Sequence, residues 1–233
     1  MNSFIQTKNY RSIKEACDNL MNSYISIEMA EITGPAGRGK TTSVQHYISS
    51  FPSSIYLRFN ENLRFGNRLF SEVAFKLSGT RVDQSKYAWQ IIEKSLNEKR
   101  IMIFIDEADR MSLRHLNAMR DIHDNFQTPV IFVGEEPLIE KIDSERRLRD
   151  RLAFRYQFSP IAESDIIIIF KQFGIDLDSL PQNEMIKALT KLKEFTTGTF
   201  RPVVSKAREA SQILSINSMD KINLQVIETI CKR

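Results

Sequence analysis

Two patterns of apolar and polar positions follow one another along the chain. In the first 160 residues, short apolar runs alternate with longer segments of helical period. Most of the runs are continuously apolar, which is typical of strands buried on both faces of a sheet. They predict five strands, at 27–33, 54–60, 101–106, 129–133 and 153–158. Strands separated by helices indicate an α/β fold with a parallel sheet covered on both faces.

The segments between these strands place apolar residues at helical spacing, as Ile13, Cys17 and Leu20 illustrate. They predict helices at 11–24, 40–50, 64–78, 84–98, 112–124 and 136–151.

The pattern changes after Pro160. No further strand is predicted, and the rest of the chain favours helices at 163–173, 183–195, 201–215 and 222–231. We therefore expect an α/β domain at residues 1–160 and a small all-helical domain at residues 161–233.

Composition narrows the class of protein. The 233 residues are 42% hydrophobic and 27% charged, which is ordinary for a globular protein, and the net charge of +4 permits a polyanionic partner without requiring one. Cys17 and Cys231 have no disulfide or metal spacing, so a reducing, cytoplasmic location is expected. The N-terminus lacks an apolar signal core and the apolar runs are too short to span a bilayer, so no membrane association is expected.

The first motif that indicates a chemical function lies at residues 34–41, which read Gly-Pro-Ala-Gly-Arg-Gly-Lys-Thr. This is the Gly-x-x-x-x-Gly-Lys-Thr phosphate loop, in which glycines let backbone N–H groups surround a phosphate. The following helix directs its positive end at the same phosphates, while Lys40 reaches their oxygens and Thr41 offers a hydroxyl to Mg²⁺. The alternative is a glycine turn before an ordinary helix. The expected nucleotide-binding residues are Gly34, Pro35, Ala36, Gly37, Arg38, Gly39, Lys40, Thr41, Thr42 and Asp106.

The second half of the site follows the third strand, which ends in Asp106 and Glu107. A buried parallel strand delivers such carboxylates to the sheet edge where ligands bind. We expect Asp106 to hold Mg²⁺, directly or through water, and Glu107 to polarise the attacking water. A single acid at such a position can instead cap a helix, which is one interpretation of Asp109. The pair predicts ATP and Mg²⁺ as ligands and ATP hydrolysis as the reaction.

With these motifs in order, nearly the whole chain resembles the AAA+ ATPases. The resemblance implies that residues 1–160 are the nucleotide-binding domain and that residues 161–233 are the all-helical lid domain. The resemblance implies an arginine finger before the fifth strand, where Arg151 fits best and Arg147 and Arg149 are the other candidates. Arginine suits this role because its planar charge matches a transferring phosphoryl group. The competing interpretation is a basic, solvated helix face.

The resemblance also implies a sensor-2 arginine, and Arg201 occupies that position in Gly-Thr-Phe-Arg-Pro at 198–202. A simple helix start with proline in its first turn is the alternative. Glu135 stands where the family usually has a small polar sensor-1 residue. A carboxylate there is repelled by a triphosphate unless it is paired, which suits slow hydrolysis. Asn60, after the second strand, is a candidate to restrain Glu107.

Three segments extend the resemblance to one branch, that of phage Mu transposition protein B and the TnsC-type transposition regulators, with ExeA-like ATPases nearby. They are residues 7–13, 31–42 and 132–138. This resemblance implies a homo-oligomer, a filament or ring, that wraps duplex DNA, chooses insertion sites and recruits or stimulates a transposase. ATP turnover is then expected to be slow and stimulated by DNA or a partner.

Duplex binding of this kind needs cations spaced along phosphates, and the aromatic residues typical of single-strand binders are sparse here. Each candidate alone can also be a solvated surface charge. The candidates are Arg64, Arg68, Lys76, Arg81, Lys86, Arg110 and Arg114. Two other functions stay open: an initiator or helicase-loader ATPase, and an ExeA-like switch that contacts only protein.

Overall fold

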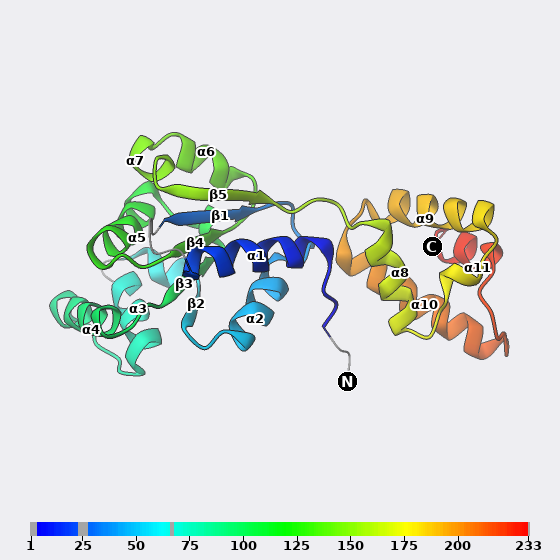
Figure 1. The fold of residues 1–233 in the computed structure, drawn as a ribbon, viewed down its shortest axis with the longest axis horizontal. Coiled ribbons are helices and arrows are strands. Elements are labelled where there is room, and N and C mark those ends of the chain that lie inside the picture. Colours follow the sequence, from blue (N-terminus) through cyan, green and yellow to red (C-terminus); the bar gives the residue numbers. More distant parts are fainter. Residues whose placement is uncertain (1–3, 23–27, 66–67, 233) are drawn as a thin grey trace. The chain divides into compact units, whose positions relative to one another are not determined.

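The computed structural model describes residues 4–22, 28–65 and 68–232 (Figure 1). Contacts among them divide the chain into two compact units. The sheet unit comprises Ile13–Ala36 and Lys40–Phe158, and the helical unit comprises Met1–Ser12, Gly37–Gly39 and Ser159–Arg233. The division after Phe158 lies close to the expected boundary at residue 160.

The sheet unit contains a five-stranded sheet in the order β2-β3-β4-β1-β5, with every pairing parallel. This confirms the α/β fold and the parallel sheet predicted from the apolar runs. The register pairs Arg58 with Asp106, so the last residues of β2 and β3 lie side by side. The strands are β1 (Met29–Thr33), β2 (Ser54–Arg58), β3 (Met102–Asp106), β4 (Val130–Val133) and β5 (Leu152–Gln157).

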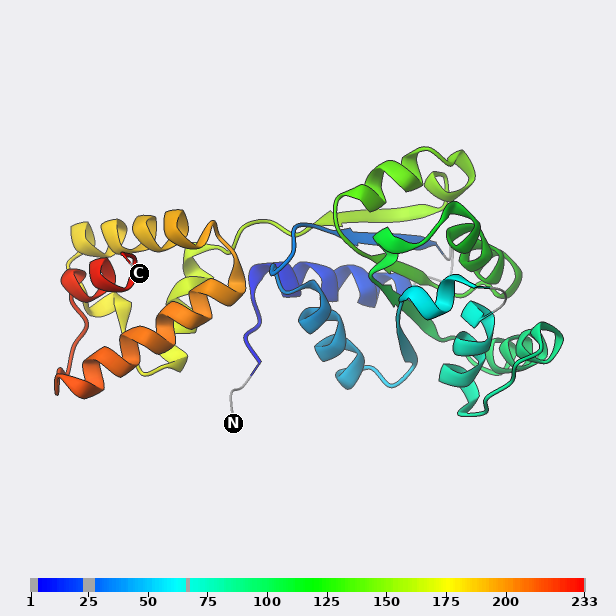
Figure 2. The same ribbon diagram turned by 180° about the vertical axis from the view of Figure 1, so that it is seen from behind.

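Helices cover both faces of this sheet. Figures 1 and 2 show α6 and α7 on one side of β1 and β5, with α1 and α2 on the other. The core between these layers includes Ile103, Ile105 and Phe132, all fully buried. The helices are α1 (Lys8–Asn22), α2 (Lys40–Ser50), α3 (Arg68–Ser78), α4 (Ser85–Glu98), α5 (Leu113–Phe126), α6 (Pro137–Asp143) and α7 (Arg146–Arg149), with short 3₁₀ turns η1 (Glu61–Arg64) and η2 (Ala108–Arg110).

The helical unit has its own core, which includes Phe170, Leu192 and Ile227. Between Ser159 and Lys232 the described chain forms helices and no strand, as predicted. Asp165 is buried and accepts hydrogen bonds from the backbone N–H of Lys8, at 3.0 and 3.2 Å, which caps the start of α1. The helices are α8 (Glu163–Gln172), α9 (Gln182–Thr196), α10 (Phe200–Ile216) and α11 (Leu224–Ile230), with a 3₁₀ turn η3 (Leu177–Ser179).

Two predicted helices differ from the structure in extent. The segment predicted at 136–151 forms two helices, because Glu145 adopts an extended conformation between α6 and α7. The segment predicted at 64–78 begins its α-helix at Arg68, after the 3₁₀ turn η1. Ile27, at the start of the first predicted strand, lies outside the described residues. In the part of the chain that the structure describes, no helix is long and apolar enough to cross a bilayer.

Candidate functional site

The phosphate loop connects β1 to α2, and its glycines adopt backbone angles that other residues rarely take. Gly34, Gly37 and Gly39 have φ angles of +145°, +76° and +93°. A Cβ atom on Gly39 would meet no other atom within 4 Å. Because space is available there, the backbone angle itself is what selects glycine at this position. The spacing of glycines in the motif therefore follows from the path of the loop.

Lys40, the first residue of α2, points its side chain back into this loop. Its ammonium donates hydrogen bonds to the carbonyl oxygens of Gly34, at 2.6 Å, and Pro35, at 2.9 Å. Burial lowers the pKa of Lys40, and the nearby Glu135 and Asp106 carboxylates oppose that shift. A half-desolvated ammonium inside a glycine loop is well suited to a phosphate, because a phosphate oxygen is a stronger acceptor than a neutral carbonyl.

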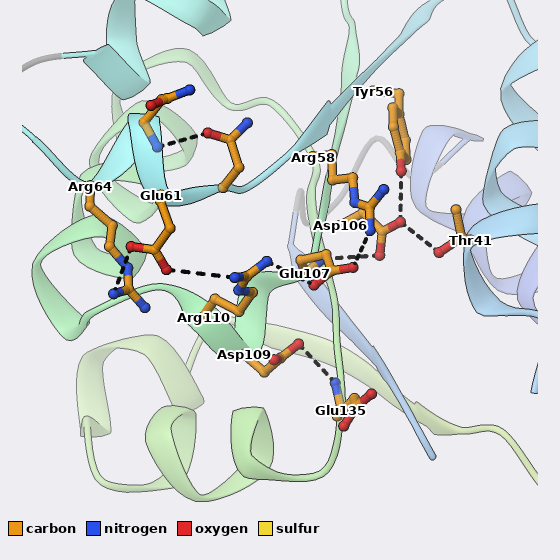
Figure 3. A network of polar contacts seen from close by, with 12 residues as sticks. Thr41, Tyr56, Arg58, Glu61, Arg64, Asp106, Glu107, Asp109, Arg110 and Glu135 are labelled. Atoms are coloured by element: carbon orange, nitrogen blue, oxygen red, sulfur yellow. Dashed lines mark hydrogen bonds and ion pairs between the residues drawn. The ribbon is translucent and has the colours of Figure 1, made fainter. Parts of the chain in front are cut away.

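Asp106, the last residue of β3, is held by neutral donors on both oxygens. Its Oδ2 accepts hydrogen bonds from the Thr41 hydroxyl, at 2.7 Å, and from the Tyr56 hydroxyl, at 2.6 Å (Figure 3). Its Oδ1 accepts from the backbone N–H of Glu107 at 2.9 Å. Burial, together with the bond to Asp106, raises the pKa of the Tyr56 hydroxyl, which therefore stays protonated and donates. Asp106 is itself buried, so its orientation is fixed from three sides.

Glu107 has a strained backbone, with φ +59° and ψ +32° in the left-handed region. This conformation costs a residue with a side chain about 1–3 kcal/mol, and such strain tends to occur at functional sites. The carboxylate lies 2.7 Å from Arg58 Nη2 and 3.5 Å from Arg110 Nη1. The hydrogen bond to Glu107 is also the main cause that raises the pKa of the Arg58 guanidinium. Glu107 is therefore held by two cations of its own chain.

These contacts continue as a row of alternating charges along the sheet edge (Figure 3). Arg110 lies 3.5 Å from Glu61, and Glu61 lies 2.9 Å from Arg64 in the turn η1. The row thus runs from Arg58 through Glu107, Arg110 and Glu61 to Arg64. All of its arginines are exposed, so the row lies at the surface beside the buried Asp106.

Asp109 fixes the end of β4 instead of capping a helix, so the interpretation of this residue as a helix cap was wrong. Its Oδ1 accepts a hydrogen bond from the backbone N–H of Glu135 at 3.0 Å. A Cβ atom on Gly134 would lie 2.7 Å from the same oxygen, so only glycine permits this approach. The Glu135 side chain is exposed, and its position is set by this backbone contact.

The three candidate finger arginines in the segment before β5 differ in their contacts and exposure. Arg151 Nε lies 2.5 Å from Asp124 Oδ1, and Arg151 Nη1 donates to the carbonyl of Arg147 at 2.8 Å. Arg147 and Arg149 are exposed on α7, and Arg149 lies 3.8 Å from Asp150. Arg151 is thus held within its own chain, and its role as a finger stays a prediction.

Arg201 lies in the first turn of α10 and is exposed, with Pro202 beside it. Both the sensor-2 role and the simple helix start agree with this placement, so the sensor-2 role stays a prediction.

The candidate DNA-binding cations are exposed in η1, α3, the loop before α4, the start of α4, η2 and α5. Arg64 and Arg110 share Glu61, and Lys76 lies 3.8 Å from Glu72. Several of the cations surround two surface hollows. One, of about 460 Å³, includes Arg58, Arg68 and Arg81 in its lining, and the other, of about 270 Å³, includes Arg64, Arg114 and His115.

Tyr56 and Arg58 were not predicted as site residues, yet they contact Asp106 and Glu107, respectively. They lie two residues apart on β2 and so face the same side of the sheet. Their register partners are Phe104 and Asp106 on β3, which is the signal that a strand-pairing argument would have needed. Asn60, the residue expected to restrain Glu107, instead accepts a hydrogen bond from the backbone of Asn62 at 3.0 Å and caps η1.

The donor set fits a magnesium ion bound together with phosphates. One carboxylate, Asp106, and one hydroxyl, Thr41, lie 2.7 Å apart next to the phosphate loop. Among the described residues there is no cluster of three or more His, Cys, Asp or Glu side chains that forms a metal cage. Mg²⁺ typically binds in this way, through one or two protein oxygens, several waters and substrate phosphates.

Comparisons with known proteins agree with this geometry. Residues 28–142 match the family model described as an AAA domain. A Staphylococcus aureus protein described as a potential ATP-binding protein is 27% identical over 266 aligned residues, covering 97% of this chain and 94% of that protein.

Among solved structures, the fold resembles that of the Aeropyrum pernix ORC2 protein in its ADPNP-ADP complexes. The TM-score is 0.66 at 10% identity, and the match covers 100% of this chain and 68% of the other. The Aeropyrum pernix ORC1 protein in complex with DNA matches with a TM-score of 0.61 at 14% identity, covering 99% of this chain and 65% of the other. At these identities the likeness concerns the fold. The phosphate loop and the paired acids both lie within residues 28–142, the part of the chain that matches the AAA domain model.

Proposed function

We propose that this protein is an ATP hydrolase that assembles on duplex DNA and acts there as an ATP-controlled switch. The observation that carries the hydrolase part is the convergence of Lys40, Thr41, Asp106 and Glu107 at one edge of the sheet. Asp106 and Thr41 would hold Mg²⁺, and the bound ion would neutralise phosphate charge.

The protein's own residues then supply positioning and proton transfer. Lys40 binds the phosphate oxygens and the loop N–H groups surround them. Glu107 orients the attacking water and accepts its proton, a role that requires its carboxylate to leave Arg58. An arginine of the segment 147–151 of a neighbouring copy would stabilise charge on the transferring phosphoryl group. Because Glu107 is held by Arg58 and Arg110, turnover by the unstimulated protein is slow.

Two observations support DNA as the partner. The exposed Arg110 and Arg64 continue the row of charges that begins at Glu107, and the exposed Arg68 lines the same hollow as Arg58. One protein of similar fold, ORC1, has been solved in complex with DNA. Phosphate contacts of this kind bind a duplex with little sequence preference and with strong salt dependence.

The biological role that we propose is regulation of transposition, by target-site selection and by recruitment or stimulation of a transposase. The support is the sequence of residues 7–13, 31–42 and 132–138, whose motifs resemble those of transposition protein B. The likeness of the whole fold to the ORC2 protein favours a second candidate, an initiator or helicase-loader ATPase.

Assembly is the first test. With ATP, Mg²⁺ and duplex DNA in 50 mM salt, sedimentation should show high-mass species that disappear at high salt. Lys40→Ala should abolish ATP binding and, with it, the assembly. A monomer at every protein, ATP and DNA concentration would rule out the proposal.

The second test asks which arginine acts as the arginine finger. Arg151→Ala should reduce hydrolysis at every protein concentration while ATP binding stays intact. Arg147→Ala and Arg149→Ala serve as matched variants, because all three lie in one segment. If only one of these lowers hydrolysis, that arginine is the finger, and the Arg151 contact with Asp124 is structural.

The identity of the binding partner distinguishes a transposition regulator from a helicase loader. A transposition regulator should bind duplex DNA more tightly than single strands of equal length and should co-purify with a transposase encoded alongside it. A stable complex with a replicative helicase, together with a preference for single strands, would favour the loader. ATP binding with no DNA affinity at low salt would favour a switch that contacts only protein.

A further inference from the structure

Arg151, the residue directly before β5, is fixed both at its backbone and at its side chain. Its backbone N–H donates to the Leu148 carbonyl at 3.1 Å, and its carbonyl accepts from the backbone N–H of Met29, on β1, at 2.8 Å. Its guanidinium Nε lies 2.5 Å from Asp124 Oδ1 on α5, and its Nη1 donates to the Arg147 carbonyl at 2.8 Å. All of these contacts lie within the sheet unit, so a single protomer already holds the side chain in one orientation.

These contacts leave the tip of the Arg151 guanidinium available to a ligand. A guanidinium carries five N–H donors, and the bonds to Asp124 and Arg147 use one on Nε and one on Nη1. The other donors lie on the Nη atoms, and 35% of the side chain is exposed. Arg151 is therefore able to keep its contact with Asp124 while its Nη groups bind an anion.

The Asp124 carboxylate is held in turn by a second arginine of its own helix. Arg120 Nε lies 3.8 Å from Asp124 Oδ2, and only 13% of the Arg120 side chain is exposed. Arg120 Nη2 donates to Asp121 at 2.7 Å, and its Nη1 donates to Asn117. Asp124 thus lies between a mostly buried arginine that is fixed on α5 and the partly exposed Arg151.

The contact between Arg151 and Asp124 differs from that of Arg149 in the same segment. Arg149 Nε lies 3.8 Å from Asp150, and both side chains are about half exposed. A contact of this length between exposed neighbours restricts a side chain little. The Asp124 contact is shorter and comes from another element, so the orientation of Arg151 depends on a carboxylate of α5.

Ordering a long side chain costs rotamer entropy, and a cost that is met on folding is no longer part of the barrier to reaction. We infer that Asp124 is a positioning residue for the proposed hydrolysis. It holds Arg151 at Nε, so that the Nη donors are directed to the phosphoryl oxygens of a nucleotide bound by a neighbouring copy. The inference rests on the proposed function, which supplies both the assembly and an arginine that acts between copies.

The first test measures phosphate release by single variants of the full-length protein with ATP, Mg²⁺ and duplex DNA. Asp124→Asn should lower kcat about tenfold and leave the KM for ATP unchanged, because Arg151 is no longer held in one orientation. Asp124→Glu, which keeps the charge, should recover part of the loss. Asp150→Asn is the matched control, because Asp150 contacts Arg146 and Arg149, and it should turn over ATP as the wild type does. A tenfold loss in this control would show an effect of any charge near Arg151 and would overturn the inference.

The second test mixes two variants that are each expected to turn over ATP slowly. Glu107→Gln protomers still present Arg151, whereas Arg151→Ala protomers keep Glu107. Their mixture should recover turnover, because the first protomer supplies its arginine to a neighbouring site that has an intact Glu107. Adding Asp124→Asn to the Glu107→Gln protomer should lower this recovery about tenfold. Adding Asp124→Asn to the Arg151→Ala protomer should leave the recovery unchanged, because that protomer has no arginine to position.

An equal loss in both mixtures would show a general effect of Asp124 on folding or assembly and would overturn the inference, as would unchanged recovery in both. Faster turnover in the Asp124→Asn single variant would also overturn it, because Asp124 would then restrain Arg151. If Glu107→Gln and Arg151→Ala assemble together on DNA without recovering turnover, only the inference fails, because Arg147 and Arg149 remain for the proposed function. A wild type that stays monomeric under all conditions would overturn both.

Discussion

Asp106 and Glu107 are neighbours in the chain, yet the regions on either side of them are built differently. On the Asp106 side, a buried carboxylate accepts hydrogen bonds from two neutral hydroxyls and one backbone N–H. On the Glu107 side, a partly exposed carboxylate is held by two arginines at the surface. The first arrangement is shielded from solvent, whereas the second is open to competing anions and to salt.

In the proposed function, this difference separates Mg²⁺ binding from turnover. Buried hydrogen bonds from neutral donors orient Asp106 with little dependence on salt. Exposed ion pairs hold Glu107 only as long as nothing stronger contacts its arginines. The same strand end therefore combines a carboxylate fixed by buried hydrogen bonds with a carboxylate held by exposed ion pairs.

The largest effect on ATP turnover is expected for substitution of Glu107. Glu107→Gln should keep ATP binding and lower turnover about 100- to 10,000-fold, because the water loses its base. Phosphate release at saturating ATP measures turnover, and a fluorescent nucleotide measures affinity. Glu98→Gln, an exposed glutamate on α4, is the control. Normal turnover in Glu107→Gln would remove Glu107 from this role.

On the Asp106 side, Asp106→Asn should weaken nucleotide binding in the presence of Mg²⁺ by about 10- to 100-fold, since a charged ligand is lost. Affinity in the presence of EDTA should stay at the wild-type value, because the phosphate loop is unchanged. Titrations with and without Mg²⁺ measure both quantities. An equal loss in EDTA would show that Asp106 supports the loop instead of the metal.

Tyr56→Phe tests whether the hydroxyls fix Asp106. Loss of one hydrogen bond to a carboxylate should lower the apparent Mg²⁺ affinity by about three- to tenfold. The measurement is a Mg²⁺ titration at constant nucleotide, with the melting temperature as a check on folding. Tyr87→Phe, at an exposed tyrosine on α4, is the control. An unchanged Mg²⁺ affinity would leave the Thr41 hydroxyl and the Glu107 backbone N–H as the groups that orient Asp106.

The smallest effect is expected for Arg110→Ala. Arg110 lies 3.5 Å from both Glu107 and Glu61, so its exposed contacts hold Glu107 less firmly than Arg58 does. DNA-free turnover should rise by less than about threefold, in line with the small contribution of exposed pairs. Phosphate release without DNA measures this. A tenfold fall would contradict the comparison, because Arg110 would then take part in hydrolysis.

The sequence was sufficient for the parts of this site that depend on local patterns. The phosphate loop and the Asp106–Glu107 strand end are contiguous motifs, and their backbone geometry follows from glycine and from a buried strand. Arg58 and Asp109 could not be assigned in the same way. Their partners, Glu107 and the backbone of Glu135, are distant in sequence and meet them only through the order of the strands.

The left-handed backbone of Glu107 has a consequence for engineering this protein. Asparagine and glycine tolerate φ near +59° better than glutamate does, so Glu107→Asn and Glu107→Gly are expected to relieve strain at the position that we propose as the catalytic base. Selection of variants for thermostability alone is expected to enrich inactive substitutions there, a stability–activity trade-off. A screen that also requires ATP turnover would retain the glutamate and accept the lower melting temperature.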